Sequence, residues 1–335
     1  MKVSVVMPVY NKADFLREAV ESILDGTYKD LELICVDDMS ADGSVAVLRS
    51  INDPRLRILE LPENVGPGRA ANAGMDAALG EYIVRMDADD IAVPERIALQ
   101  TAFMDAHPEV GASGGQLQLF GAEDQPWIFP LDADRCAAEL LFGVPVAQPA
   151  SILRRSVLLA QQLHFDPAWP RIGEDWLFWL RMAPHTRFAN LPEVLVRYRR
   201  GPQNIGHGSD KVANFTWLQQ QAFHALGIPL NEEELDLHLM GSTIFKVKPT
   251  VARVRALRRW YDRLLALNAE QGFAPRKAFA ERVEQQWNKL FHYLPRYGLS
   301  VALAHLRLNS GRTVAQLTYA LKYRVNALRG KLPNG

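Results

Sequence analysis

Closely spaced acidic residues occur in two places where they could act on a charged substrate. Asp87, Asp89 and Asp90 lie within one short stretch that directly follows the apolar run from Tyr82 to Met86. Neighbouring carboxylates repel one another and favour a counter-charge. A hard divalent cation is suited to this role, because Mg²⁺ commonly takes one or two carboxylates together with substrate phosphates. Aspartates also cap helices, so the residue types alone leave capping as an equal alternative.

The second acidic group, Glu174 and Asp175, precedes an aromatic segment that contains Trp176 and Phe178. Apolar neighbours remove water from a carboxyl group and raise its pKa. A carboxylate in such a setting is suited to act as the general base that removes a proton from a hydroxyl group. The alternative is that both acids simply stabilise the N-terminus of a helix.

Two further polar segments could bind a nucleotide. Asp37 and Asp38 follow the apolar run LELICV, and at least one of them has no capping role, so it could accept hydrogen bonds from a base or a ribose. The segment from Asn64 to Gly74 is rich in glycine and alanine, and its Arg69 could reach a phosphate. The same small residues would equally well allow a helix to pack closely on a sheet.

The elements that must position these residues alternate between strand and helix over the first 90 residues. This alternation predicts an α/β fold with a mostly parallel sheet covered on both faces. We predict strands over residues 3–9, 31–36, 56–61 and 82–86, and helices over 14–24, 43–51 and 68–79. In such sheets ligands bind at the carboxyl ends of the strands. Every polar cluster of the first 90 residues falls at this edge, which favours the metal interpretation of the aspartates over capping.

The alternation of strand and helix becomes less regular after residue 110. Gln116 to Phe120 and Ala147 to Leu153 are expected to be strands, and a helix is expected to begin at Glu174. The run GPQNIGHGS, over residues 201–209, has the composition of a linker, and the chain beyond it has a helical pattern. We therefore predict an α/β domain over residues 1–209, with a nucleotide-binding half over 1–110 and an acceptor half, which carries the candidate base, over 111–209. A helical region is expected over 210–335.

Composition narrows the class of protein. Apolar residues make up 48% and charged residues 23% of 335 residues, which is ordinary for a globular protein. Acidic residues outnumber basic ones over 1–210, which disfavours nucleic-acid binding, and the balance reverses over 211–335. The two cysteines, Cys35 and Cys136, predict no disulfide framework. With no apolar run of about 20 residues and no signal-peptide pattern, we expect a cytoplasmic protein.

The C-terminal segment combines an apolar stripe with many cations. The apolar positions are Val314, Leu317, Leu321, Val325 and Leu328, and the cations are Arg312, Lys322, Arg324, Arg329 and Lys331. A basic amphipathic helix of this kind could lie at the inner face of an anionic membrane. The commoner role of such a stripe is to pack against a neighbouring domain. The segment from Val251 to Leu267 allows the same two interpretations.

Four segments resemble glycosyltransferase family 2, whose members have the GT-A fold. They are VVMPVYNKADFLREAVESIL, LICVDDMSADGS, ENVGPGRAANAGMDAALGEYIVRMDADDIAVPERI and GEDWLFWLRM, and they span about residues 1–205. The resemblance implies an inverting transfer of sugar from a UDP- or dTDP-type nucleotide to an acceptor hydroxyl, with Mn²⁺ or Mg²⁺ as cofactor. The implied acceptor is a glycan or a lipid-linked molecule in the assembly of cell-surface polysaccharide or glycolipid.

The resemblance also implies a role for each candidate residue. Asp175 would be the catalytic base, Glu174 would orient it, and Asp89 would hold the metal. Asp38 would meet the base of the nucleotide, and Arg69 would lie near the uridine or the diphosphate. The expected nucleotide-sugar-binding residues are Pro8, Tyr10, Asp37, Asp38, Asn64, Arg69 and Asp87.

The chain departs from the family pattern in two places. Gln148-Pro149 stands where a histidine is common, and after Tyr198-Arg199 the next histidine and serine are the distant His207 and Ser209.

Two other classes of protein are less well supported by the residues. A nucleotidyltransferase would need a glycine-rich phosphate loop after the first strand, and a non-catalytic sensor would not need the pair Glu174-Asp175.

Overall fold

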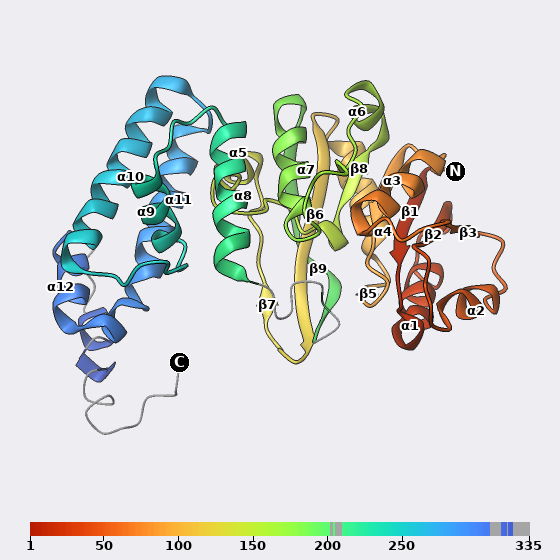
Figure 1. Ribbon diagram of the computed structural model, residues 1–335. Coiled ribbons are helices and arrows are strands. Elements are labelled where there is room, and N and C mark those ends of the chain that lie inside the picture. Colours follow the sequence, from red (N-terminus) through yellow and green to blue (C-terminus); the bar gives the residue numbers. More distant parts are fainter. Residues whose placement is uncertain (202–203, 205–209, 309–315, 320, 324–335) are drawn as a thin grey trace. The chain divides into compact units, whose positions relative to one another are not determined.

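The computed structural model describes residues 1–201, 204, 210–308, 316–319 and 321–323, which form two compact units, Met1–Ser209 and Asp210–Gly335 (Figure 1). His207 and Ser209 lie outside the described residues. Most of the predicted amphipathic stripe at the C-terminus lies outside them as well, including Val314, Val325 and Leu328 and the cations Arg312, Arg324, Arg329 and Lys331. Within the described residues, no helix is long and apolar enough to cross a membrane.

The first unit is built on one sheet with the strand order β3-β2-β1-β4-β8-β6-β9-β5, and β7 pairs with β6 (Figure 1). The strands β1 to β4 run parallel to one another, and β6 runs parallel to β9. The predicted α/β class with a mostly parallel sheet is confirmed. The strands are β1 Val3–Val9, β2 Leu31–Asp37, β3 Leu56–Glu60, β4 Tyr82–Arg85, β5 Ile91–Ala92, β6 Val110–Gly121, β7 Pro126–Trp127, β8 Ile152–Arg154 and β9 Arg187–Arg200.

The strands and helices of the first 90 residues agree with the prediction to within three residues at each end. The helices of this part and the next are α1 Ala13–Leu24, α2 Ser44–Arg49, α3 Pro67–Ala77 and α4 Arg96–Ala106. The strands β1 and β2 are almost wholly buried and rich in branched apolar residues. A Cβ on Gly74 would come within 2.4 Å of Val6 Cγ1, so a small residue is required where α3 crosses β1. Close helix–sheet packing therefore accounts for this part of the glycine-rich segment.

The predicted strand over Ala147 to Leu153 is largely wrong. Gln148–Ala150 forms a single 3₁₀ turn, η1, and only Ile152–Arg154 pairs as β8. Pro149 has no backbone N–H to donate to a neighbouring strand. The amides of Ala150 and Ser151 instead donate to the carbonyls of Ala147 and Gln148. The remaining helices of this unit are α5 Ala133–Glu139, α6 Arg155–Ala160, α7 Glu174–Met182 and the 3₁₀ turn η2 Ala183–His185.

The second unit is helical over its described residues. Its elements are α8 Lys211–Ala225, α9 Glu232–Gly241, α10 Val251–Gln271, α11 Arg276–Phe291, the 3₁₀ turn η3 Leu294–Tyr297 and α12 Leu299–Leu308. Its core is aromatic: Trp260, Tyr261, Trp287 and Phe291 are all at most 3% exposed. The indole of Trp287 stacks on the imidazole of His305 at 4.0 Å. These contacts give the unit a packed interior of its own.

Candidate active site

The carboxyl ends of β1, β2 and β4 lie side by side, as the sequence predicted. Asp37 pairs in register with Val9, and the amide of Asp38 donates to the Val9 carbonyl at 2.8 Å. The strand β4, which leads into Asp87, pairs with β1 on its other side. Tyr10, which is 46% exposed, follows β1 at this edge. The polar ends of three strands therefore face one region of solvent.

Asp38 holds the glycine-rich loop in place. Its carboxylate accepts the amides of Val65 at 2.7 Å and of Gly66 at 2.9 Å, and its backbone carbonyl accepts the Asn64 side-chain amide at 3.0 Å. Gly66 has φ of +91°, which favours glycine. The Oδ1 atom of Asp37 is buried and has no hydrogen-bond partner. Asp38 thus has a structural role that the sequence interpretation did not include, and Asp37 has the spare acceptor.

We expect Asp38→Ala to lower the free energy of unfolding by about 2–3 kcal/mol, because two buried amides lose a charged acceptor. Denaturant unfolding followed by circular dichroism measures this change. Glu63→Ala is the matched control, since Glu63 is exposed in the same loop, and we expect it to change stability by less than about 0.5 kcal/mol. Equal losses in the two variants would contradict the loop-holding role.

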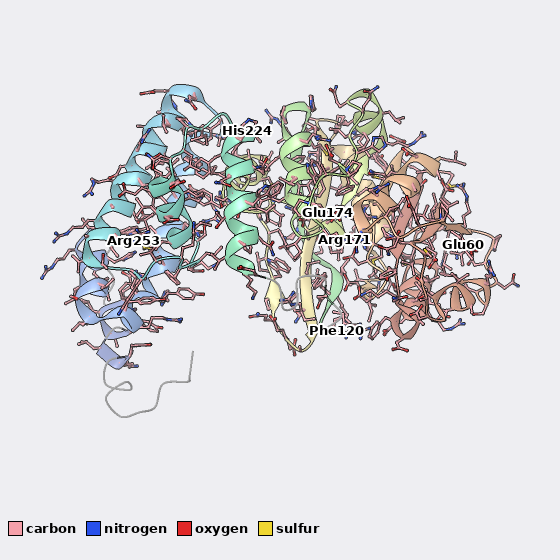
Figure 2. All side chains as sticks on the ribbon, in the orientation of Figure 1. Glu60, Phe120, Arg171, Glu174, His224 and Arg253 are labelled. Carbon is pink, nitrogen blue, oxygen red and sulfur yellow. The ribbon has the colours of Figure 1, made fainter. Side chains whose placement is uncertain are left out.

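Arg171 joins the glycine-rich loop to the segment that precedes α7. Its Nη2 donates to Asn64 Oδ1 at 2.7 Å, and its Nε lies 3.1 Å from the position that a Gly66 Cβ would occupy. Figure 2 shows Arg171 and Glu174 close together in the first unit. The sequence analysis missed Arg171. Arg69 is exposed and makes no hydrogen bond or ion pair with any described residue, so its guanidinium is free to reach a ligand.

The aspartate cluster after β4 faces a cation from the segment that joins β1 to α1. Asp89 is 7% exposed, and its Oδ2 lies 2.6 Å from the Lys12 ammonium. Burial and, after it, the charge of Asp89 raise the pKa of Asp87 to about 6, against the opposing charges of Arg85 and Lys12. Two carboxylates in this position repel each other, and only one of them has a close cationic partner. The pair therefore favours additional positive charge.

Asp90 is a structural member of the same cluster. It is 1% exposed, and its Oδ1 accepts the amide of Arg199 at 2.7 Å. Burial, followed by the charges of Asp87 and Asp89, raises its pKa well above the ordinary value. The Arg199 guanidinium donates to the Asp89 carbonyl at 2.8 Å. Asp90 thus fixes the end of β9 against this loop.

The second acidic pair begins α7. Gly173 has the left-handed φ of +82° and directly precedes Glu174. Burial raises the pKa of Asp175, and the amide of Trp176 donates to its Oδ1 at 2.8 Å. Burial raises the pKa of Glu174 to about 8, although the Arg85 guanidinium acts in the opposite direction. The placement at a helix N-terminus is the one expected of stabilising acids, and it does not exclude a catalytic role.

The two acidic groups predicted from the sequence come together in space. The charge of Asp175 raises the pKa of Asp87, and the charges of Asp175 and Asp87 both raise the pKa of Glu174. A Cβ on Gly68 would lie only 2.4 Å from Glu174 Oε2, so Glu174 contacts the first turn of α3. The site therefore combines groups that are more than 80 residues apart in the chain. Such a cluster of carboxyl groups with raised pKa values is typical of catalytic sites.

The Glu174 carboxyl makes stability depend on pH. Its pKa is about 8 in the folded protein and about 4.5 ordinarily, so between these values the folded state binds more protons and stability falls as pH rises. Glu174→Gln removes this dependence. We expect the melting temperature of the variant to rise relative to that of the parent as the pH increases from about 5 to about 8. A gain of the same size at both pH values would contradict the raised pKa.

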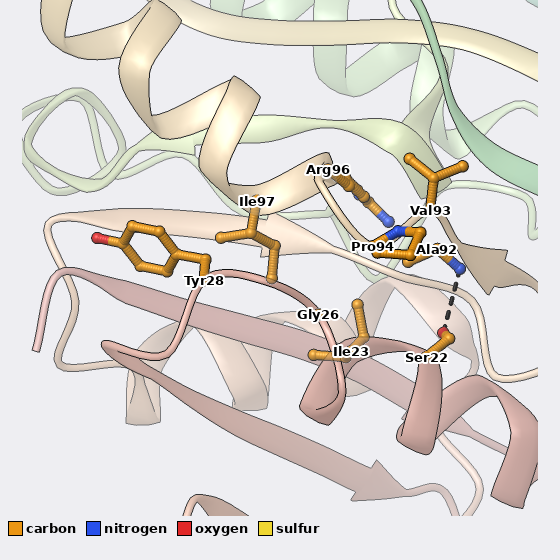
Figure 3. Close-up of a pocket in the computed structure, with 9 residues that line it drawn as sticks. All are labelled: Ser22, Ile23, Gly26, Tyr28, Ala92, Val93, Pro94, Arg96 and Ile97. Carbon is orange, nitrogen blue, oxygen red and sulfur yellow. Dashed lines mark hydrogen bonds between the residues drawn. The ribbon is translucent and has the colours of Figure 1, made fainter.

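A small pocket lies apart from these groups. It is lined by Ser22, Ile23, Gly26, Tyr28, Ala92, Val93, Pro94, Arg96 and Ile97, and the amide of Ala92 donates to Ser22 Oγ across it at 3.1 Å (Figure 3). None of the predicted site residues lines it.

Within the described residues, no group of three or more His, Cys, Asp or Glu side chains could hold a metal ion.

Comparison with solved structures identifies the fold. The chain superposes on Staphylococcus aureus TarS 1–349 in complex with UDP-GlcNAc with a TM-score of 0.59 and 18% identity, covering all of this chain and 93% of that one. It also superposes on the mannosyltransferase PcManGT of Pyrobaculum calidifontis, in complex with GDP-Man and Mn²⁺, with a TM-score of 0.50 and 18% identity, covering 99% and 88% of the two chains. The fold is therefore GT-A.

Two curated relatives resemble this chain in sequence. The succinoglycan biosynthesis protein ExoO of Rhizobium meliloti is 34% identical over 52% of this chain and 53% of its own length. The amylovoran biosynthesis glycosyltransferase AmsE of Erwinia amylovora is 30% identical over 60% of this chain and 77% of its own length. The chain spans between about half and two thirds of the first curated relatives that it matches. The model of the glycosyl transferase family 2 matches residues 4–159, and this chain belongs to that family.

Proposed function

We propose that this glycosyltransferase moves a sugar, with inversion, from a UDP- or dTDP-type nucleotide to an acceptor hydroxyl in the assembly of a surface polysaccharide or glycolipid. The observation that carries the proposal is that Glu174 packs against the glycine-rich segment, with its Oε2 2.4 Å from the position of a Gly68 Cβ, while Asp87 is close enough to raise its pKa. A donor-side acid and a candidate base therefore lie at one site. The names of ExoO and AmsE, and the UDP-GlcNAc bound to TarS, support this class of reaction.

The residues of the aspartate cluster fit a hard divalent cation. Asp87 and Asp89 repel each other, and Asp89 already holds the Lys12 ammonium at 2.6 Å. We infer that Asp89, with Asp87 beside it, would hold Mn²⁺ or Mg²⁺ together with the donor phosphates. The bound ion would act as a Lewis acid that neutralises charge on the departing diphosphate. The Mn²⁺ in PcManGT supports this assignment.

The remaining residues of the site bind the nucleotide, orient the catalytic base and remove the proton of the acceptor hydroxyl. Tyr10 and Pro8 flank the nucleotide at the end of β1, and the spare Oδ1 of Asp37 accepts a hydrogen bond from it. Arg69, which is exposed, approaches the phosphates. Asp175 takes the proton from the attacking hydroxyl, since burial raises its pKa toward that of an effective base. Glu174 orients Asp175 from the same helix turn.

The basic charge of the second unit favours an acceptor that is itself negatively charged or is held at a negatively charged surface. Basic residues outnumber acidic ones over residues 211–335. Arg255 and Arg259 are exposed one turn apart on α10. We propose that these helices contact an anionic membrane surface at the cytoplasmic face, where a lipid-linked acceptor would be held.

A thermal-shift screen of nucleotide-sugars, with and without Mn²⁺, tests the proposed function. We expect UDP- or dTDP-sugars to raise the melting temperature, and Mn²⁺ to enlarge the shift. A protein that no nucleotide-sugar stabilises in either condition would not be the transferase proposed here. A shift with nucleotide-sugar but no transfer to any acceptor would favour a sensor.

A further inference from the structure

An exposed group of large apolar side chains follows β6. Trp127 is 43% exposed, Ile128 is 66% exposed and Leu131 is 44% exposed, whereas Phe129 between them is buried. Single exposed apolar residues are ordinary, but these three lie within one five-residue stretch of the chain, which makes this stretch a candidate binding surface. We call Trp127, Ile128 and Leu131 the Trp127 platform.

The Trp127 indole stands on a packed base. Trp127 of β7 pairs with Leu117 of β6, and Leu117 pairs in turn with Val196 of β9. Residues that pair directly across neighbouring strands place their side chains on the same face of a sheet, so these three side chains share one face. The indole lies 5.4 Å from the ring of Phe129 and 6.2 Å from that of Tyr198, with an edge-to-face angle of 83° to the latter. The exposed part of Trp127 is therefore supported from beneath by fixed aromatic neighbours.

Two consecutive residues of β9 connect the platform to the acidic cluster. Tyr198 contacts Trp127, and the phenol lies within the electric field of Asp87 and Asp89. Arg199 donates its amide to Asp90 and its guanidinium to the Asp89 carbonyl. Trp127 thus contacts a tyrosine whose neighbour in β9 is hydrogen-bonded to the acidic cluster.

The hairpin that carries the platform is fixed by polar contacts. Arg200 Nε lies 3.2 Å from Glu123 Oε1, and the Gln118 side-chain amide donates to Asp124 at 2.8 Å. The amide of Leu119 donates to the Gln125 carbonyl at 2.9 Å. A surface that is already ordered loses little conformational entropy when a ligand binds.

Strand order separates the platform from the nucleotide side of the site. The strands β1 and β2, with Tyr10 and Asp37, lie on one side of β4, and β6, β7 and β9 lie on the other. Asp87 follows β4 and so lies between them. An aromatic surface on the nucleotide side could stack on a base, but Trp127 lies on the opposite side of β4 from β1 and β2.

We propose that the Trp127 platform binds a pyranose ring of the acceptor by stacking, an inference that rests on the proposed function. One face of a pyranose presents axial C–H groups and is apolar, while its hydroxyl groups point outward and can stay hydrated. The aromatic face is negative and attracts such C–H groups. The acceptor class is therefore a glycan with a terminal pyranose, in preference to an acyclic polyol.

Titration of the full chain with methyl glucopyranoside and methyl galactopyranoside tests this, using NMR in the presence of the nucleoside diphosphate that stabilises the parent. We expect Trp127→Ala to raise the Kd for at least one pyranoside by about tenfold, which corresponds to ~1.4 kcal/mol, and Trp127→Phe to raise it less. Trp217→Ala is the matched control, because Trp217 is similarly exposed on α8. Glucitol should bind no more tightly to the parent than to Trp127→Ala.

Three outcomes would overturn the proposal. The first is equal pyranoside affinity in the parent and in Trp127→Ala with the thermal stability of the variant also unchanged, the second is no pyranoside binding by a parent that binds the nucleotide, and the third is equal affinity together with a loss of thermal stability in Trp127→Ala. The last would mean that Trp127 packs against protein. Nucleotide binding in the thermal-shift screen is a separate measurement, so its failure would contradict the proposed function and not the platform alone.

Discussion

Asp175→Asn should reduce transfer by about 10²–10⁴-fold, the usual cost of losing a general base. The asparagine keeps one acceptor oxygen, so the hydrogen bond from the Trp176 amide can persist and the helix start is retained. It cannot take a proton from the acceptor. Because the nucleotide and the metal are assigned to other residues, we expect kcat to fall while donor affinity is unchanged. Steady-state kinetics of sugar transfer, with a separate titration of donor binding, measure the two quantities.

Glu174→Gln is the matched variant for this test. Glu174 precedes Asp175 in the same helix turn and is also coupled to Asp87, but it contacts the start of α3 through Gly68. We expect a smaller loss of kcat from this variant than from Asp175→Asn. If Glu174→Gln is inactive and Asp175→Asn is active, the base is Glu174. If both variants keep full activity, the proposed mechanism is wrong.

The strands and helices of the first 90 residues could be predicted because their signals are local. Buried parallel strands such as β1 and β2 are apolar along their whole length, and the helices between them carry a regular apolar stripe. Because a helix after each parallel strand returns the chain to the start of the next strand, the carboxyl ends of these strands lie at a common edge of the sheet. The proximity of Asp37, Asp87 and Tyr10 therefore followed from the order of elements, without knowledge of any contact.

Two cations of the site, Lys12 and Arg171, could not be predicted because they contact residues that are distant in the sequence. Lys12 reaches Asp89 from the end of β1, and Arg171 reaches Asn64 from the segment before α7. Nothing in their local sequence indicates these partners. Arg85 did leave a signal, since it is a charged residue within the apolar run YIVRM. A cation buried in a strand requires nearby negative charge, and the structure supplies it through Asp87 and Glu174.

The role of Asp38 shows a different limit. Its sequence setting resembles that of a nucleotide-binding residue, and the polar edge of the sheet is its correct location. The structure uses both of its carboxylate oxygens to hold the amides of Val65 and Gly66. A carboxylate can satisfy a loop or a ligand, and only the coordinates show which groups are within hydrogen-bonding distance. Contact between Asp38 and the base of a nucleotide stays a prediction.

Asp89→Asn should remove most of the Mn²⁺-dependent gain in donor affinity. Loss of residues that merely support a metal ligand costs about 10–100-fold in metal affinity, so loss of the ligand itself should cost at least as much. Isothermal titration of nucleoside diphosphate, with and without Mn²⁺, measures the gain. Without the metal, we expect the parent and the variant to bind the nucleotide with similar affinity.

Asp90→Asn separates a metal ligand from a structural acid in this experiment. Asp90 neighbours Asp89 but is 1% exposed and bonded to the Arg199 amide, so its substitution should affect stability and leave the Mn²⁺-dependent gain intact. Asp89→Asn also deprives Lys12 of its carboxylate partner, and its melting temperature must therefore be measured beside its affinity. If Asp89→Asn is folded and keeps the full Mn²⁺-dependent gain, Asp89 is not the metal-binding residue. A loss confined to Asp90→Asn would move that role to its neighbour.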